Sequence, residues 1–505
     1  MLTPARVGEA LVARDEPLLS PSRIPAEVML LAGLTLLGAM LRFATVSHQS
    51  FWLDEALAAR ELHLSFGSML SAIGRGEPNP PLFFLIAWPW AKLFGTSEAG
   101  IRSLLVVAGT ALIPIAYLCG RELVSRRAGM LAAAFTALSP FMIWYSQEAR
   151  EYMLLAAFCG ASFLFFARVW HRRSGHSLVW WSVFSALAVL THYFAAFLVA
   201  PEALVLLYRE RSRASVVAVT GVAVVQGAML PHFISHASHP LGWIGAFPLS
   251  VRIKQVPVAF ALGSLYQSSA VRYGLIGAAI LAAVVIVLLV IGARSDELRG
   301  AGLAAAIAGA VLLVPLVLAA FGHDYYVPRA LIAAWVPLAL VIAAACTSVR
   351  TWPAGAALAL VMVAAFVYAG IRIAGNATYQ RPNWRGVAVA LGPASGTRAV
   401  VANDGGFGAV PLALYLHGEE LGSTSTASVT VGEIDVVGNV FDRRATNLPA
   451  GVSALGQKSV GGYLVQRFRL SAPLRLTSAQ IDARAQALLE IPSPGAAVLI
   501  QRSSA

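Results

Sequence analysis

Long apolar runs dominate the sequence and constrain the fold more than any other feature. Runs of roughly 17–25 apolar residues are long enough to cross the hydrocarbon core of a bilayer as helices, and they recur from residue 26 to residue 373. Of the 505 residues, 58% are hydrophobic and only 12% are charged, whereas soluble domains carry about 25% charged residues. The sequence therefore predicts a mainly α protein, a polytopic bundle of transmembrane helices.

The positions of the basic residues predict how the chain crosses the membrane. Lys and Arg gather in short clusters between the apolar runs, as in GRELVSRRAG at 120–129, and basic loops stay in the cytoplasm. Alternating the two sides predicts about eleven spans over residues 26–375, preceded by a cytoplasmic leader at 1–25. The apolar run around Pro89 is too short to cross, so residues 47–100 are expected to form one long external loop. This organisation is typical of an integral multi-pass protein of the inner or plasma membrane.

The composition changes near Thr378, after the last predicted span. Residues 378–505 contain short alternating apolar runs such as TRAVVAN and GGYLVQRFRL, a helical stretch VPLALYLHG, and frequent Gly and Pro. This pattern is typical of a small soluble α/β domain. Because the last span leaves the cytoplasm in the predicted topology, we expect this domain on the extracytoplasmic side.

Charge and cysteine usage exclude some classes of function. The net charge of +12 does not indicate nucleic acid as a partner, because no basic face of a folded domain is visible. Cys119, Cys159 and Cys346 lie in or beside apolar runs, at no metal-ligand spacing, and are expected to be packing residues. A transporter or flippase of lipid-linked saccharides is the alternative function, although transporters usually place charges at mid-membrane within repeated halves.

Ionisable and polar residues gather at the predicted outer ends of the helices. Such groups are costly beside a bilayer and indicate function where they converge. A carboxylate can accept a proton from an acceptor hydroxyl, and an arginine can hold a phosphate with two hydrogen bonds. Carboxylates that face arginines therefore fit a reaction with a phosphate leaving group. The gathered residues include Asp54, Glu55, Glu77, Asn79, Glu148, Arg150, His192, Tyr193, Tyr326 and Arg329.

Structural roles stay open for several of these side chains. Each of them could simply solvate the end of a loop. Arg102 could form a helix-end salt bridge with Glu98, four residues earlier, and His192 could be an interfacial histidine with satisfied hydrogen bonds. Glu148 and Glu151 flank Arg150 in the sequence and could merely neutralise it.

Six segments taken in order resemble the GT-C superfamily of membrane glycosyltransferases, specifically the glycosyltransferase family 39 type. That type includes protein O-mannosyltransferases and the aminoarabinose transferase acting on lipid A. The segments are LDEALAAREL (53–62), GEPNPPLFFLIAWPWAKLFGTSEAGIRSL (76–104), SPFMIWYSQEAREYML (139–154), THYFAAF (191–197), YYVPRALIAA (325–334) and QRPNWRGVAVAL (380–391). The chain shows no intervening repeat domain like that of the eukaryotic members, which favours a bacterial envelope role.

The resemblance implies an activity and a pair of substrates. A sugar would pass from a polyprenyl-phosphate carrier to an extracytoplasmic acceptor, which could be a glycan, a lipid or a protein, with inversion at the anomeric carbon. Asp54 would be the base that activates the acceptor hydroxyl, and Glu55 would orient it or bind sugar hydroxyls.

The same resemblance implies roles for the other candidates. Arg150 and Arg329 would stabilise the departing phosphate, with Arg102 and His192 next in line. No His or Cys cluster predicts a metal site, although carboxylates alone could bind Mg²⁺ or Mn²⁺. The remaining candidates for binding the donor or the acceptor are Tyr193, Glu148, Tyr326, Glu77 and Asn79.

Overall fold

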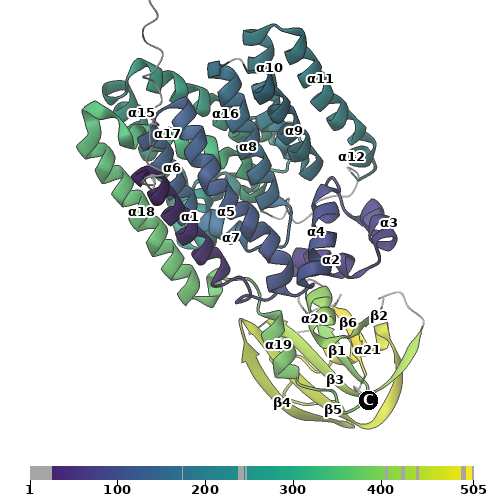
Figure 1. The fold of residues 1–505 in the computed structure, drawn as a ribbon. Coiled ribbons are helices and arrows are strands. Elements are labelled where there is room, and N and C mark those ends of the chain that lie inside the picture. Colours follow the sequence, from purple (N-terminus) through teal and green to yellow (C-terminus); the bar gives the residue numbers. More distant parts are fainter. Residues whose placement is uncertain are drawn as a thin grey trace, which may run out of the picture.

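The computed structural model has two parts, a helical bundle and a sheet domain that sits against one end of it (Figure 1). The structure describes residues 25–172, 174–236, 244, 247–403, 408–421, 427–439, 443–490 and 496–502. Residues 1–24 of the predicted leader, and the segment 237–243 of one predicted external turn, lie outside the described residues.

Eight helical segments of the described chain are long and apolar enough to cross a membrane. A ninth span is possible if α6 and α7, which meet at a bend of 58°, are counted as one. The predicted polytopic helical bundle is therefore confirmed. The helices concerned are α1 (Ala26–Phe43), α5 (Glu98–Leu123), α6 (Arg126–Leu138), α7 (Pro140–Ser146), α8 (Tyr152–Arg172), α11 (Arg213–Ala228), α15 (Gly274–Gly292), α16 (Ser295–Ala320), α17 (Trp335–Thr347) and α18 (Trp352–Gly375).

Two of the eleven predicted spans are shorter than the sequence suggested. Helix α9 (Gly175–Thr191) has 17 residues and α10 (Ala196–Glu210) has 15. At 1.5 Å per residue, 17 residues rise only about 25 Å, less than the thickness of a hydrocarbon core of about 30 Å. Between the two helices, His192 and the short 3₁₀ turn η1 (Tyr193–Ala195) interrupt the chain. The apolar residues of this turn belong to neither helix, so each helix is shorter than the apolar run in the sequence.

Short elements fill the end of the bundle that faces the sheet domain (Figure 1). Within the predicted external loop lie α2 (Leu53–His63), α3 (Phe66–Gly76) and α4 (Leu82–Phe94), the last with only 13 residues and Pro89 inside it. Helix α14 (Leu249–Leu262) was not predicted, because Arg252 and Lys254 interrupt its apolar pattern. The remaining short elements at this end are α12 (Leu230–His236), η2 (Gly263–Gln267), η3 (Ser269–Tyr273), η4 (Pro328–Ala334) and η6 (Ala377–Tyr379). The turn η5 (Val349–Thr351) precedes α18 at the opposite end of the bundle.

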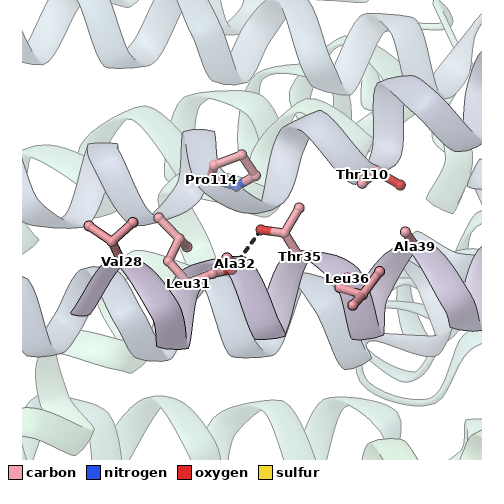
Figure 2. A pocket seen from close by; sticks show the side chains of 8 residues that line it. All are labelled: Val28, Leu31, Ala32, Thr35, Leu36, Ala39, Thr110 and Pro114. Carbon is pink, nitrogen blue, oxygen red and sulfur yellow. Dashed lines mark hydrogen bonds between the residues drawn. The ribbon is translucent and has the colours of Figure 1, made fainter. Parts of the chain in front are cut away.

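Small residues allow the central helices to pack closely. A Cβ atom added to Gly120 of α5 would lie 2.3 Å from the Cα of Gly129 in α6, so the two backbones touch where both residues lack a side chain. Between α1 and α5 an apolar groove of about 490 Å³ opens on the outside of the bundle (Figure 2). Its lining residues are Val28, Leu31, Ala32, Thr35, Leu36, Ala39, Thr110 and Pro114.

The sheet domain is the predicted small α/β domain. The described residues of this domain form six strands in the order β2-β6-β1-β3-β5-β4, and among these pairs only β1–β3 is parallel. Both faces are covered, because apolar clusters lie under α21 on one side and under α19 and α20 on the other. The elements are β1 (Arg398–Ala402), β2 (Glu419–Leu421), β3 (Ser428–Asn439), β4 (Val452–Val460), β5 (Tyr463–Thr477), β6 (Ala497–Gln501), α19 (Trp384–Leu391), α20 (Ala409–Leu416) and α21 (Ser478–Gln486).

Candidate active site

The two adjacent carboxylates, Asp54 and Glu55, occupy the first turn of α2. Acidic side chains are favourable there, because the N-terminus of a helix carries a partial positive charge. Neighbouring residues on a helix point about 100° apart, and the structure separates the two accordingly. The side chain of Glu55 is fully buried, whereas that of Asp54 is 23% exposed. The two residues therefore have different surroundings and different roles.

Glu55 is anchored by Arg102. Arg102 donates from Nε and Nη2 to the two carboxylate oxygens, both at 2.7 Å, and Ala149 donates its backbone N–H to Oε1 at 2.7 Å. Burial by itself would raise the pKa of Glu55, but the charges of Arg102 and Arg381 and these hydrogen bonds hold the pKa below its usual value. Both oxygens of Glu55 are thus engaged in tying α2 to the rest of the protein.

All three guanidinium nitrogens of Arg102 donate hydrogen bonds in the protein interior. Its other donors bind the carbonyl oxygens of Val46, Gln49 and Ser50 at 2.6–3.1 Å. The alternative that paired Arg102 with Glu98 is wrong, since Glu98 accepts instead from Arg385 and from the hydroxyl of Tyr415. The sequence spacing suggested the wrong partner because a buried guanidinium selects the carboxylate that tertiary packing brings to it.

Asp54 pairs with Arg329, 275 residues further along the chain. Nη1 of Arg329 donates to Oδ2 of Asp54 at 3.0 Å, and both side chains are partly exposed. The guanidinium carbon of Arg329 also lies 5.5 Å from the ring centroid of Trp52 and 5.3 Å from that of Tyr152. The aromatic rings restrict the arginine on two sides. A carboxylate and an arginine are thereby held together at an accessible position.

Arg150 lies in a separate, buried cluster. It donates to both oxygens of Glu77, at 3.0 and 3.1 Å, and its Nε lies 3.0 Å from Oε2 of Glu151. The side-chain amide of Asn79 donates to Glu77 and Glu151 at 3.2 and 2.9 Å. Burial, opposed by the charge of Arg150 and aided by that of Glu77, raises the pKa of Glu151 to about 7. Arg150 is thus neutralised by two carboxylates, one of them Glu77 from the predicted external loop.

Arg381, which the sequence analysis did not name as a candidate, binds Glu148. Nη2 of Arg381 donates to Oε2 of Glu148 at 2.9 Å, whereas Oε1 of Glu148 has no hydrogen-bond partner among the described residues. Burial raises the pKa of Glu148, against the opposing charges of Arg381 and Arg329. The signal for Arg381 was present in the segment QRPNWR, but nothing in the sequence indicated which carboxylate it would meet.

The remaining candidates surround these clusters. His192 accepts the backbone N–H of Phe194 at Nδ1, 3.1 Å away, and burial lowers its pKa to about 3, so it is neutral at pH 7. Tyr193 donates to the carbonyl of Met229 at 3.4 Å, away from Asp54. Tyr326 is buried, and its carbonyl accepts from Arg252 at 2.9 Å. His192 can position neighbours, but as a neutral ring it brings no positive charge to a phosphate.

The carboxylates of the site fit a divalent cation poorly. In the described part of the chain, no three His, Cys, Asp or Glu side chains converge as metal ligands. Asp54, Glu55, Glu77 and Glu148 each face an arginine at 2.7–3.0 Å. At Glu55 and Glu77, where arginines engage both oxygens, a cation would have to displace a guanidinium. No step of the proposed mechanism therefore passes through a metal.

Known proteins resemble this chain in sequence over one segment and in fold over most of its length. Residues 78–235 match the family model described as dolichyl-phosphate-mannose-protein mannosyltransferase. This segment contains Arg102, Glu148, Arg150 and His192. No curated protein matches the sequence.

Solved structures of two proteins resemble this structure to different degrees. ArnT from Cupriavidus metallidurans, bound to undecaprenyl phosphate, is 14% identical with a TM-score of 0.51, over 87% of this chain and 97% of ArnT. The oligosaccharyltransferase AglB from Archaeoglobus fulgidus is 15% identical with a TM-score of 0.41, over 72% of this chain and 57% of AglB. The family match over residues 78–235 and the fold shared with ArnT agree with the resemblance that the motifs carried, and the chain is a multi-pass membrane protein.

Proposed function

We propose that this protein transfers a sugar from a polyprenyl-phosphate carrier to a hydroxyl group of an extracytoplasmic acceptor, with inversion at the anomeric carbon. The observation that carries the proposal is the partly exposed pair of Asp54 and Arg329, which puts a base beside a phosphate-binding cation. ArnT, the structure with the same architecture, is described as bound to undecaprenyl phosphate. The comparisons above are all with glycosyltransferases, so the flippase alternative gains no support.

The proposed reaction is a single displacement. Asp54 accepts the proton of the acceptor hydroxyl while the oxygen of that hydroxyl forms a bond to the anomeric carbon of the sugar. The bond between that carbon and the phosphate oxygen breaks, and its electron pair leaves with the polyprenyl phosphate. Because this leaving group is a stabilised anion, a single carboxylate is sufficient and no dedicated general acid is needed.

Arg329 is proposed to hold the phosphate of the carrier. A guanidinium presents five N–H groups in one plane, so it can donate to Asp54 and to a phosphate together. The charge that develops on the leaving oxygen would be stabilised by a cation that is already fixed by Trp52 and Tyr152. Arg150 is the weaker candidate, since Glu77 and Glu151 neutralise it in a buried cluster.

The other partners follow from the predicted topology. The active site and the sheet domain would lie on the extracytoplasmic side, with the prenyl chain of the donor in the surrounding lipid. The acceptor is proposed to be a glycan, lipid or protein of a bacterial cell envelope. The transferred sugar is proposed to be a hexose or a pentose, and the mass spectrometry below distinguishes the two by mass.

Mass spectrometry of envelope glycans and lipid carriers tests this function. Cells that lack the gene should lose one glycan modification and accumulate the corresponding polyprenyl-phosphate sugar. Complementation with wild type should restore the modification, whereas Asp54→Asn should not, because the amide cannot accept the proton. Asp296→Asn is the matched control, since Asp296 is 91% exposed and its ion pair among the described residues is with Arg299 in its own helix. Full restoration by Asp54→Asn would remove Asp54 from the mechanism, and unchanged glycans and carriers would overturn the function.

A further inference from the structure

The segment that enters the sheet domain also contributes a side chain to the active site. Helix α18 ends at Gly375, η6 follows, and Arg381 stands just before α19. The side chain of Arg381 is only 3% exposed. It lies between carboxylates that belong to two other parts of the chain, the first turn of α2 and the turn between α7 and α8.

The contacts of Arg381 hold it on several sides. Besides the bond from Nη2 to Glu148, its Nε lies 3.7 Å from Oε2 of Glu55. Its guanidinium carbon lies 4.2 Å from the ring centroid of Trp144, and Nη2 also donates to the carbonyl of Trp144 at 3.3 Å. The backbone N–H of Arg381 donates to the side chain of Gln49 at 2.9 Å.

These contacts connect the two active-site segments. Glu55, next to Asp54, accepts the backbone N–H of Ala149, and Ala149 follows Glu148 in the sequence. One buried cation therefore faces both carboxylates. Removing it would leave Glu148 without its hydrogen-bond donor beside the negative charge of Glu55, which would keep only Arg102 as its charge partner. We propose that Arg381 is a positioning residue, through which the start of the sheet domain fixes α2 and the 147–151 turn relative to each other.

Arg381 should also set the protonation of Glu148. The groups that act on Glu148 are Arg381, Arg329, Glu55, Tyr145 and Tyr266. Among these groups, only Arg381 donates a hydrogen bond to the carboxylate of Glu148 within the described residues. An ionised Glu148 keeps its hydrogen bond from Arg381 and is also attracted by the charge of Arg329. Without Arg381, burial and the charge of Glu55 would favour the protonated form.

Hydrogen exchange of the purified protein in nanodiscs tests the positioning role without any assay of activity. Arg381→Gln should speed exchange of the Ala149 and Trp52 amides, which donate to Glu55, by about tenfold or more. Exchange in the remote helices α15 and α16 should not change. Arg381→Lys keeps the charge and should show a smaller effect. Arg372→Gln is the matched control, because Arg372 is an exposed arginine at the end of α18.

The pH dependence of sugar transfer is the second readout, and this part rests on the proposed function. Arg381→Gln should be slow at pH 7 and recover as the pH rises, since a higher pH ionises Glu148 again. Arg381→Lys should keep the wild-type profile, and Arg381→Gln with Glu148→Gln should lose the alkaline recovery. Wild-type exchange in Arg381→Gln would overturn the positioning role, and a wild-type pH profile would overturn the effect on Glu148. If Arg381→Gln does not fold, Arg381→Lys decides the positioning role: faster exchange of the Ala149 and Trp52 amides would support it, and wild-type exchange would reduce Arg381 to a stabilising residue. If the wild-type protein transfers no sugar, the proposed function fails while the exchange result still decides the positioning role.

Discussion

Arg329 is the residue whose replacement should most clearly separate donor binding from acceptor binding. Arg329→Lys keeps the charge but loses the planar pair of donors, so the KM for a polyprenyl-phosphate sugar should rise about tenfold. Arg329→Ala should reduce kcat/KM for this donor by about 10²–10³, the usual effect of removing one group that stabilises developing charge. Initial rates at varied donor and acceptor concentrations measure both effects. The same changes at the 75% exposed Arg299 provide the control, and a change in acceptor KM alone would place Arg329 on the acceptor side.

Glu55, in contrast, should matter for stability before it matters for chemistry. Glu55→Gln leaves the buried guanidinium of Arg102 without its charge partner, which typically costs about 3–5 kcal/mol. Because the pKa of Glu55 is lower in the folded state, the stability from this group is present above about pH 4.3, its unfolded value, and is lost as the pH falls through the folded pKa. Thermal unfolding in detergent measures both the loss of stability in Glu55→Gln and the dependence of stability on pH. Asp296→Asn should change stability by less than about 1 kcal/mol, as expected for an exposed pair, and an equal effect of the two substitutions would contradict the anchoring role.

The break between α6 and α7 is the clearest case in which one element depends on another. Pro140 has no N–H, so the carbonyl of Thr136, four residues earlier, loses its helical donor. Arg42 of α1 replaces it, donating to the carbonyls of Thr136 and Ala137 at 2.8 and 3.0 Å, and to the hydroxyl of Ser146 at 3.0 Å. The bend of 58° is therefore stabilised from outside the two helices, and it directs α7 toward the turn that carries Glu148 and Arg150.

Arg42→Leu should consequently lower the thermal unfolding temperature and also reduce activity. The two carbonyls would be left buried without donors, at a typical cost of about 1–3 kcal/mol each. Arg42→Lys can satisfy fewer of them and should have an intermediate effect. The comparison variant is Arg126→Leu, since Arg126 is 77% exposed and makes only a 3.4 Å contact with Glu27. Equal unfolding temperatures for Arg42→Leu and wild type would show that α7 holds its position without α1.

For the whole molecule, the predicted orientation can be tested with single cysteines. The three native cysteines are buried, so they should give little background with an impermeant thiol reagent. From the distribution of basic loops we expect Glu77 and Trp88 outside and Arg126 inside. Glu77 is itself buried against Arg150, so exposed neighbours are better probes. Arg75→Cys in α3 and Lys458→Cys in β4 should react in intact cells, and Arg126→Cys only after permeabilisation. Labelling of position 126 in intact cells would invert the topology.

The apolar pattern alone predicted the kind of fold and most of its helices. Backbone groups in lipid must be satisfied within each segment, so apolar runs longer than the bilayer is thick can be read directly as helices. The spans near residues 26, 98, 152, 274 and 352 begin within a few residues of where the apolar pattern placed them. The pattern was less informative where charges entered, as in α14, and where helices were short, as in α9 and α10.

Which polar residues meet depends on how the helices and the sheet domain pack together. Asp54 and Glu55 are neighbours in the sequence, yet one faces Arg329 at an accessible position and the other is buried on Arg102. Neither pairing, nor that of Arg381 with Glu148, follows from spacing along the chain. An ion pair forms wherever packing brings two side chains within a few ångströms, and a buried charge then takes the partner that best repays its lost hydration. Hydropathy is a property of each segment, whereas the active site depends on how the segments pack together.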